Sequence, residues 1–166
     1  MKITVDFADR VVPQAYAKGA ALSQAGLPFL SFPFALHEVH RGAKSLAWTL
    51  MDWDAIPVCG FPYIHWVVAN VPANQLTIPE DFARQGKAHT RGINSSYSPL
   101  WEERPFDLRH GYIGPCPPDK DHRYELKVYA LDTLLPLSDD FYLNQLFEAM
   151  EGHVLDVAEL ELIGQA

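Results

Sequence analysis

The chain lacks several features that mark whole classes of protein. It has only two cysteines among 166 residues, Cys59 and Cys116, and neither lies in a CxxC or other zinc-type spacing. This pattern favours two independent reduced thiols, although a disulfide between them is also compatible with the sequence. No apolar run reaches the roughly 20 residues that cross a bilayer, so no membrane segment is predicted. Residues 1–20 carry charges and no apolar run of secretory type, which predicts a cytoplasmic location.

Basic residues are also scarce. Thirteen Lys and Arg face 21 Asp and Glu, which gives a formal net charge of −8. Nucleic-acid binding depends on cations that neutralise phosphates, so this balance argues against a nucleic-acid partner. It argues equally against electrostatic docking on an anionic membrane surface. The sequence contains no GxSxG, HExxH or Walker-type loop, and therefore no common hydrolase or nucleotide-binding motif.

What is present is an ordinary globular composition, 48% hydrophobic and 20% charged. A length of 166 residues suits one domain with a sizeable core, and no linker, repeat or low-complexity tract divides it. We therefore predict a single domain over residues 1–166.

Short apolar runs bounded by Pro and Gly, or alternating with polar residues, predict that the chain is mainly β. Two continuous runs, 46–51 and 64–71, read as buried strands. Alternation predicts a half-buried strand at 1–7, another at 122–131 and a last strand at 158–162. Residues 27–39 are apolar but contain two prolines, which suits an edge strand or a bulged one.

One substantial helix is predicted in the C-terminal half, from a cap at Ser138 to about Met150. Its apolar face would include Phe147, which together with Trp48 is a candidate core residue. A short helix is expected at 79–85, and the rest of 72–110 should be a long surface excursion. These elements together predict an antiparallel β-sandwich with one helix and a few helical turns.

Polar side chains stand at the ends of the two central strands. Asp52 and Asp54 follow the first strand, and His65 opens the second. Side chains at strand ends gather at one rim of a sheet, where a rigid frame can hold a site. Asp54 alone is more typical of a turn cap or of a structural pair with Arg123, and we expect Arg123 to be buried.

Four segments in order carry a family resemblance. They are Asp52-Trp-Asp-Ala-Ile-Pro57, His65-Trp-Val-Val-Ala-Asn70, Gly111-Tyr-Ile-Gly-Pro-Cys-Pro-Pro118 and His122-Arg-Tyr124. Together they resemble the DPDAP, H-[FW]-x-V-x-N, G-P-x-P-P and HRY signatures of the phosphatidylethanolamine-binding protein family, also called Raf kinase inhibitor proteins. The likeness is greatest to its bacterial and archaeal YbhB/YbcL branch and extends over nearly the whole chain. Trp53 and Ile56 replace the two prolines of DPDAP, so the shape of that corner is open.

The resemblance implies a β-sandwich with a small anion pocket at one end. Carried over by position, the ligand-binding residues would be Asp52, His65, Gly114, Pro115, His122 and Tyr124. Trp53, Tyr63 and Arg91 would lie at the pocket mouth, Arg91 because Thr90-Arg91 with Asn94 resembles a T-R-N segment of the branch. The resemblance also implies a tendency to form homodimers and, from eukaryotic members, regulation of partner proteins.

The residues themselves suggest how such a pocket would work. An Asp beside a His raises the pKa of the imidazole, so His65 and His122 could donate charge-assisted hydrogen bonds to a phosphate. Asp52 could either orient and charge His65 or face the ammonium of a zwitterionic ligand. We therefore predict a non-enzymatic protein that binds a small anionic ligand, such as phosphate or a phosphorylated headgroup, without a metal or cofactor. The alternative is a metal-dependent hydrolase or oxygenase that uses Asp52, His65 and His122 as ligands.

Overall fold

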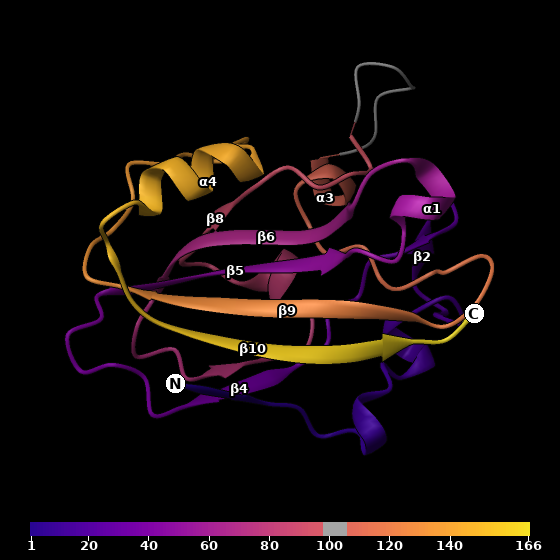
Figure 1. The fold of residues 1–166 in the computed structure, drawn as a ribbon, viewed down its shortest axis with the longest axis horizontal. Coiled ribbons are helices and arrows are strands. Elements are labelled where there is room, and N and C mark those ends of the chain that lie inside the picture. Colours follow the sequence, from indigo (N-terminus) through magenta and orange to yellow (C-terminus); the bar gives the residue numbers. More distant parts are fainter. Residues whose placement is uncertain (98–105) are drawn as a thin grey trace.

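The computed structural model describes residues 1–97 and 106–166, and these residues form a β-sandwich (Figure 1). The larger sheet has five strands in the order β10-β9-β5-β6-β8, and the smaller has three in the order β1-β4-β7. A two-strand hairpin, β2-β3, stands apart. Every strand pair in the sheets is antiparallel, as the sequence predicts.

The larger sheet is the frame of the molecule. Its strands are β5 (Ser45–Asp52), β6 (Tyr63–Pro72), β8 (Thr90–Arg91), β9 (His122–Leu131) and β10 (Val154–Gly164). All eight residues of β5 are buried, because β5 has a neighbour on each side and is covered on both faces. The prediction of β9 is confirmed at both ends. Burial alternates along this strand with its period of two.

The smaller elements lie around this frame. The strands are β1 (Lys2–Thr4), β2 (Ser23–Gln24), β3 (Leu27–Pro28), β4 (Phe34–His37) and β7 (Thr77–Ile78). The helices are α1 (Ile56–Cys59), α2 (Phe82–Gln85), α3 (Phe106–Arg109) and α4 (Leu143–Met150), with 3-10 turns η1 (Ala8–Arg10) and η2 (Gln14–Tyr16). The strand predicted over 27–39 is thus two short strands separated by an irregular stretch.

The two sheets enclose an aromatic core. Trp48 and Trp66 meet nearly edge to face, with ring centroids 5.2 Å apart, and Phe34 packs edge-on against both. Aromatic pairs in this arrangement add to the stability gained by burial alone. The prediction that Trp48 is a core residue is confirmed, since it is fully buried.

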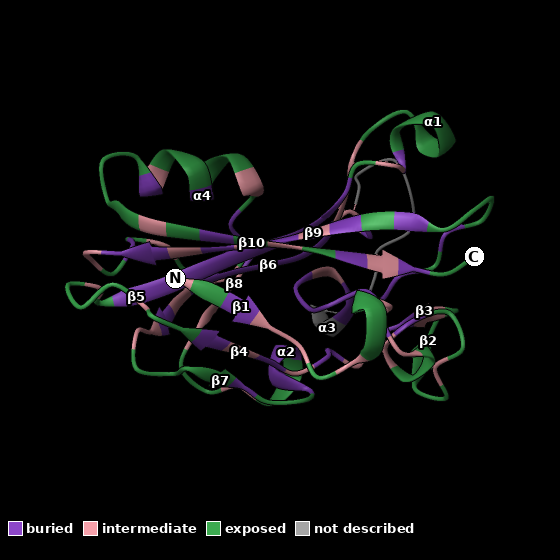
Figure 2. Cartoon of the chain, turned by 60° about the horizontal axis from the view of Figure 1, so that its bottom comes forward, coloured by how far each residue is buried: buried purple, intermediate pink, exposed green. Residues whose placement is uncertain are grey.

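A second apolar cluster lies on the other face of the larger sheet, beneath α4 (Figure 2). Leu146 and Met150 of α4 are buried against Ala47 of β5, Ala69 of β6 and Leu131 of β9. The predicted core position of Phe147 is wrong, because 47% of this residue is exposed. The helix is shorter than its periodicity suggests, and its first turn is capped by Gln145, whose side chain accepts a hydrogen bond from the backbone N–H of Tyr142.

The stretch 72–110 is only partly a surface excursion. Ile78, Phe82, Ile93 and Asn94 are buried, and the Asn94 amide donates a hydrogen bond of 2.9 Å to the carbonyl of Gly111. Residues 98–105 of this stretch lie outside the described residues. Within the part that is described, none of the helices is long and apolar enough to cross a membrane.

Candidate functional site

The predicted rim exists where β5 ends, β6 begins and β9 begins. Asp52 is the last residue of β5 and is paired in register with Tyr63 of β6 and Tyr124 of β9. A cavity of about 240 Å³ lies at this end of the sandwich. Its wall includes five of the six predicted ligand-binding residues, namely Asp52, His65, Gly114, His122 and Tyr124, together with Tyr63 from the predicted mouth. Their role as ligand-binding residues stays a prediction.

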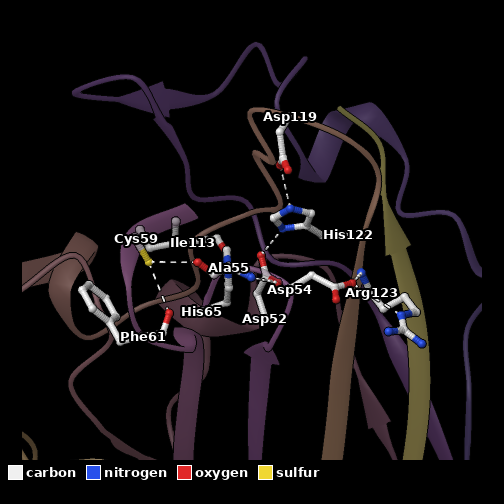
Figure 3. A network of polar contacts seen from close by, with 10 residues as sticks. All are labelled: Asp52, Asp54, Ala55, Cys59, Phe61, His65, Ile113, Asp119, His122 and Arg123. Atoms are coloured by element: carbon white, nitrogen blue, oxygen red, sulfur yellow. Dashed lines mark hydrogen bonds and ion pairs between the residues drawn. The ribbon is translucent and has the colours of Figure 1, made fainter. Parts of the chain in front are cut away.

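Asp52 and His122 form the polar centre of this wall (Figure 3). The Nδ1 atom of His122 lies 2.8 Å from Oδ2 of Asp52, and Oδ1 of Asp52 accepts a 3.0 Å hydrogen bond from the backbone N–H of Ala55. Both residues are buried, at 3% and 1% exposure. The Ala55 contact holds the carboxylate at the start of the α1 turn, so Asp52 is fixed from both sides.

The second ring nitrogen of His122 meets another carboxylate. Its Nε2 lies 2.9 Å from Oδ1 of Asp119, whose side chain is 50% exposed. Burial lowers the pKa of His122, but the hydrogen bonds and negative charges of Asp52 and Asp119 outweigh burial and raise this pKa above its ordinary value of 6.5. Because a carboxylate accepts hydrogen bonds, the contacts of both ring nitrogens with carboxylate oxygens favour the doubly protonated, positively charged form of His122.

His65 is in the opposite electrostatic state. It is buried, and its desolvation lowers its pKa from 6.5 to about 4, more than the hydrogen bond to Ile113 and the charge of Asp52 raise it. The expectation that Asp52 charges His65 is therefore wrong, because Asp52 is hydrogen-bonded to His122 instead. Neutral His65 donates from Nδ1 to the carbonyl of Ile113 over 2.7 Å, which leaves Nε2 as an acceptor.

Two tyrosines enclose the His65 ring. Tyr63 and Tyr124 have ring centroids 4.8 Å and 5.0 Å from the imidazole. Tyr124 is buried, and its pKa is raised first by desolvation and then by the negative charge of Asp52. Tyr124 is thus a neutral wall of the cavity rather than a source of charge.

The loop 111–121 closes one side of the cavity. Gly114 is required there, because a Cβ at this position would lie 2.2 Å from the backbone oxygen of Tyr16. Pro117 and Pro118 line the cavity beyond it and have no N–H to offer a ligand. Pro115 is buried next to Gly164 and Tyr124 but does not line the cavity.

Two of the predicted mouth residues lie elsewhere. Trp53 lines a neighbouring hollow with Arg123 and Glu161. Arg91, on β8, is ion-paired to Asp139 at 3.1 Å and does not line the cavity. Of the described residues that line the cavity, none is Lys or Arg.

Asp54 stands outside the cavity and has the structural role that the sequence predicts. Its Oδ2 accepts a 3.0 Å hydrogen bond from the backbone N–H of Arg123 and a 3.4 Å contact from the guanidinium. The expectation that Arg123 is buried is wrong, since 64% of its side chain is exposed. Arg123 is on the outward-facing side of β9, where alternation places every second residue.

Two features of the site were not predicted. Asp119 is absent from the predicted set, although its spacing of three residues from His122 was a signal that the two side chains could meet. Cys59 and Cys116 both line the cavity and are free and exposed. The fold brings the two thiols to one cavity wall, although they are 57 positions apart in the sequence.

A metal centre finds no support in this geometry. Within residues 1–97 and 106–166, no group of three or more His, Cys, Asp or Glu side chains is arranged to hold a metal ion. His122 has both ring nitrogens engaged by carboxylates, and Nδ1 of His65 is engaged by a backbone carbonyl. Of the four ring nitrogens of these two histidines, three are therefore engaged within the chain.

Comparisons with known proteins agree with the fold and with the family that the motifs resemble. The sequence model described as phosphatidylethanolamine-binding protein matches residues 9–164. The chain is 46% identical to the uncharacterized protein YxkA of Bacillus subtilis (strain 168), over 84% of each chain. A crystal structure of a putative phosphatidylethanolamine-binding protein homolog from Chlamydia trachomatis matches with a TM-score of 0.76 and 30% identity, over 99% of this chain and 95% of the other. The structure of Escherichia coli YbcL, described as a member of the mammalian family, shares the fold at a TM-score of 0.77 and 23% identity, over 99% and 98% of the two chains.

Proposed function

This chain belongs to the phosphatidylethanolamine-binding protein family, and on that premise we propose that it is a non-enzymatic binding protein whose cavity holds a small ligand with a phosphate-type anionic group. The observation that carries the proposal is His122, a buried imidazole whose pKa is raised by two carboxylates and which lies in the wall of a mostly apolar cavity. A charged donor out of water forms stronger hydrogen bonds to an anion than a neutral donor does.

The rest of the wall favours a ligand that carries a donor as well as an anion. Asp52 is an anionic acceptor, and the Nε2 atom of neutral His65 is a neutral one. A ligand that is only an anion would offer no donor to Nε2 of His65 and would be repelled by the charge of Asp52, whereas an ammonium or hydroxyl group could donate to Nε2. The proposed ligand class is therefore zwitterionic or hydroxylated, with phosphoethanolamine as the simplest probe.

The size of the cavity supports a small ligand. At about 240 Å³ it lies below the range of roughly 300–1,000 Å³ that holds drug-sized molecules. A headgroup fits this volume, and any longer chain attached to it would have to leave through the mouth. Regulation of a protein partner, a homodimer and a cytoplasmic location stay predictions.

Calorimetric titration with phosphoethanolamine and with inorganic phosphate tests the proposal. We expect binding by the native chain, loss of binding in His122→Gln, and unchanged binding in His153→Gln. His153 is a matched control because it forms the same kind of pair, with Nδ1 2.8 Å from Oδ1 of Asp132, but is 45% exposed and lies at the opposite end of β9. Equal affinity in the native chain and His122→Gln, or no binding of either probe, would overturn the proposal.

A further inference from the structure

The two carboxylates that hold His122 differ in how firmly they are placed. Asp52 ends a buried strand, and its other carboxylate oxygen is bonded to the N–H of Ala55. Asp119 lies in the loop before β9, and half of its side chain is exposed. If one of these carboxylates is exchanged for a ligand, Asp119 is the one that can leave, because water can solvate its charge after release.

An anionic ligand has to make this exchange. Both ring nitrogens of His122 are engaged, one by each carboxylate, so no N–H of this ring is free for a phosphate oxygen (Figure 3). The contact at Nε2 is 2.9 Å long, the ordinary length of a charge-assisted hydrogen bond. The Asp119 carboxylate, which is not itself among the residues that line the cavity, thus has the charge and the distance from Nε2 that a bound anionic oxygen would have.

We propose that Asp119 occupies the place of the ligand's anionic group on Nε2 of His122, and that it determines which anions the cavity accepts. This inference rests on the proposed function. A ligand that displaces Asp119 replaces one charge-assisted hydrogen bond by another, so the exchange itself contributes little binding free energy. The apparent affinity is the intrinsic affinity multiplied by the fraction of molecules in which Asp119 has left the ring.

The displaced carboxylate also sets the selectivity. It stays in the loop directly after Pro118, which lines the cavity, and no Lys or Arg among the described lining residues offsets its charge. Each further negative charge on a ligand is therefore opposed by Asp119 as well as by Asp52. Phosphoethanolamine, with its ammonium group, should bind better than inorganic phosphate for this reason.

The test is calorimetric titration of Asp119→Asn with inorganic phosphate and with phosphoethanolamine. The amide keeps the shape of the side chain and removes its charge, so we expect affinity for phosphate to rise about tenfold and affinity for phosphoethanolamine to rise less. Ring ¹⁵N shifts of His122 would establish a pH at which the imidazole is protonated in every variant.

Asp121→Asn is the matched control. It removes the same charge from the same loop, but the Asp121 carboxylate accepts a 3.0 Å hydrogen bond from the N–H of Ala166 and not from His122. We expect its affinities to stay within about twofold of the native values, because an exposed charge that is not in contact is screened by solvent and salt.

The outcomes separate this inference from the proposed function. A native chain that binds, with unchanged or weaker binding in Asp119→Asn, would overturn the role of Asp119 and leave the binding function intact. Equal gains in Asp119→Asn and Asp121→Asn would show an effect of net charge only and would also overturn it. No binding of either probe by any variant would overturn both.

A second measurement does not depend on affinity. When phosphoethanolamine binds to the native chain, the side-chain ¹³C signal of Asp119 should shift, and the pKa of its carboxyl should rise toward its ordinary value because the contact with His122 is lost. A purely structural Asp119 would keep both unchanged, and that result would overturn the inference.

Discussion

Strands β5, β6 and β9 run through both ends of the larger sheet, and the two ends are covered differently. Where β5 begins and β9 ends, Ala47 and Leu131 are sealed under Leu146 of α4. Where β5 ends and β9 begins, Asp52 and His122 stand beside a cavity. Among the described residues, the α1 turn, the proline-rich loop and Leu27 of β3 line the cavity at this second end. The same paired strands form both ends, so the covering segments and the residues at the strand ends decide whether an end becomes core or site.

The largest expected loss of stability comes from a cavity at the end of the sheet that α4 covers. Leu146→Ala removes a fully buried side chain from α4 and should lower the free energy of unfolding by about 4 kcal/mol, measured by urea denaturation. Phe147→Ala, on the exposed side of the same helix, should cost less than about 1 kcal/mol. Ligand affinity should be unchanged in both variants. A similar loss of stability in the two would contradict this assignment of core and surface.

The next effect is a loss of stability at acid pH, which arises from His65 in the cavity wall. The pKa of His65 is about 4 in the folded chain and near 6.5 when unfolded, so folding opposes its protonation. The stabilisation from neutral His65 is complete above about pH 6.5 and is lost as pH falls toward 4, by about 3 kcal/mol in all. Unfolding measured against pH should show this loss in the native chain and not in His65→Gln. Parallel curves for the two proteins would contradict it.

A smaller effect distinguishes two His–Asp pairs. His122→Gln leaves the buried carboxylate of Asp52 without its cation, which should lower the free energy of unfolding by about 2 kcal/mol. The bond from Ala55 to Asp52 keeps this loss moderate. His153→Gln breaks a half-exposed pair and should cost less than about 1 kcal/mol. Equal losses would mean that burial does not distinguish the pairs.

The pKa of His122 is raised, so its contribution to stability has the opposite pH dependence from that of His65. The contribution is complete below about pH 6.5 and is lost as pH rises through the folded-state pKa. The difference in unfolding free energy between the native chain and His122→Gln should therefore shrink at alkaline pH. A difference that grows with pH would contradict the charged state of His122.

The smallest effect leaves stability untouched. Cys59 and Cys116 are exposed and line the cavity, so both should react with a maleimide in the folded chain. Saturating phosphoethanolamine should slow both reactions, as followed by mass spectrometry. Protection of neither thiol would place the ligand outside this cavity.

Much of the frame could be predicted because its signals are local. Alternation along 122–131 follows directly from a strand buried on one face, and the apolar runs of β5 and β6 follow from burial on both faces. The order of motifs placed Asp52, His65 and His122 at one rim, and the structure brings them to one cavity wall.

The errors arose where distant contacts override local pattern. The predicted helix from Ser138 begins only at Leu143, because Asp139 is bonded to Arg91 and Phe141 pairs with Gly92. Those contacts hold 139–141 outside the helix, and Asp140 has a positive φ of 79°. The charge of His65 could not be predicted from the sequence either, because it depends on which histidine contacts Asp52 and on complete burial of His65.

The anchoring of the loop that carries Asp119 has a consequence for the speed of ligand exchange. The N–H of Ile113 is bonded to the carbonyl of His65, that of Gly114 to the carbonyl of Pro28, and His122 already belongs to β9. A movement of Asp119 away from His122 is thereby confined to the loop segment between Gly114 and His122, and the two sheets need not separate. Loop motions of this extent occur in nanoseconds to microseconds. On ligand binding, backbone relaxation should therefore change in this loop segment alone, while the neighbouring strands keep uniform order parameters.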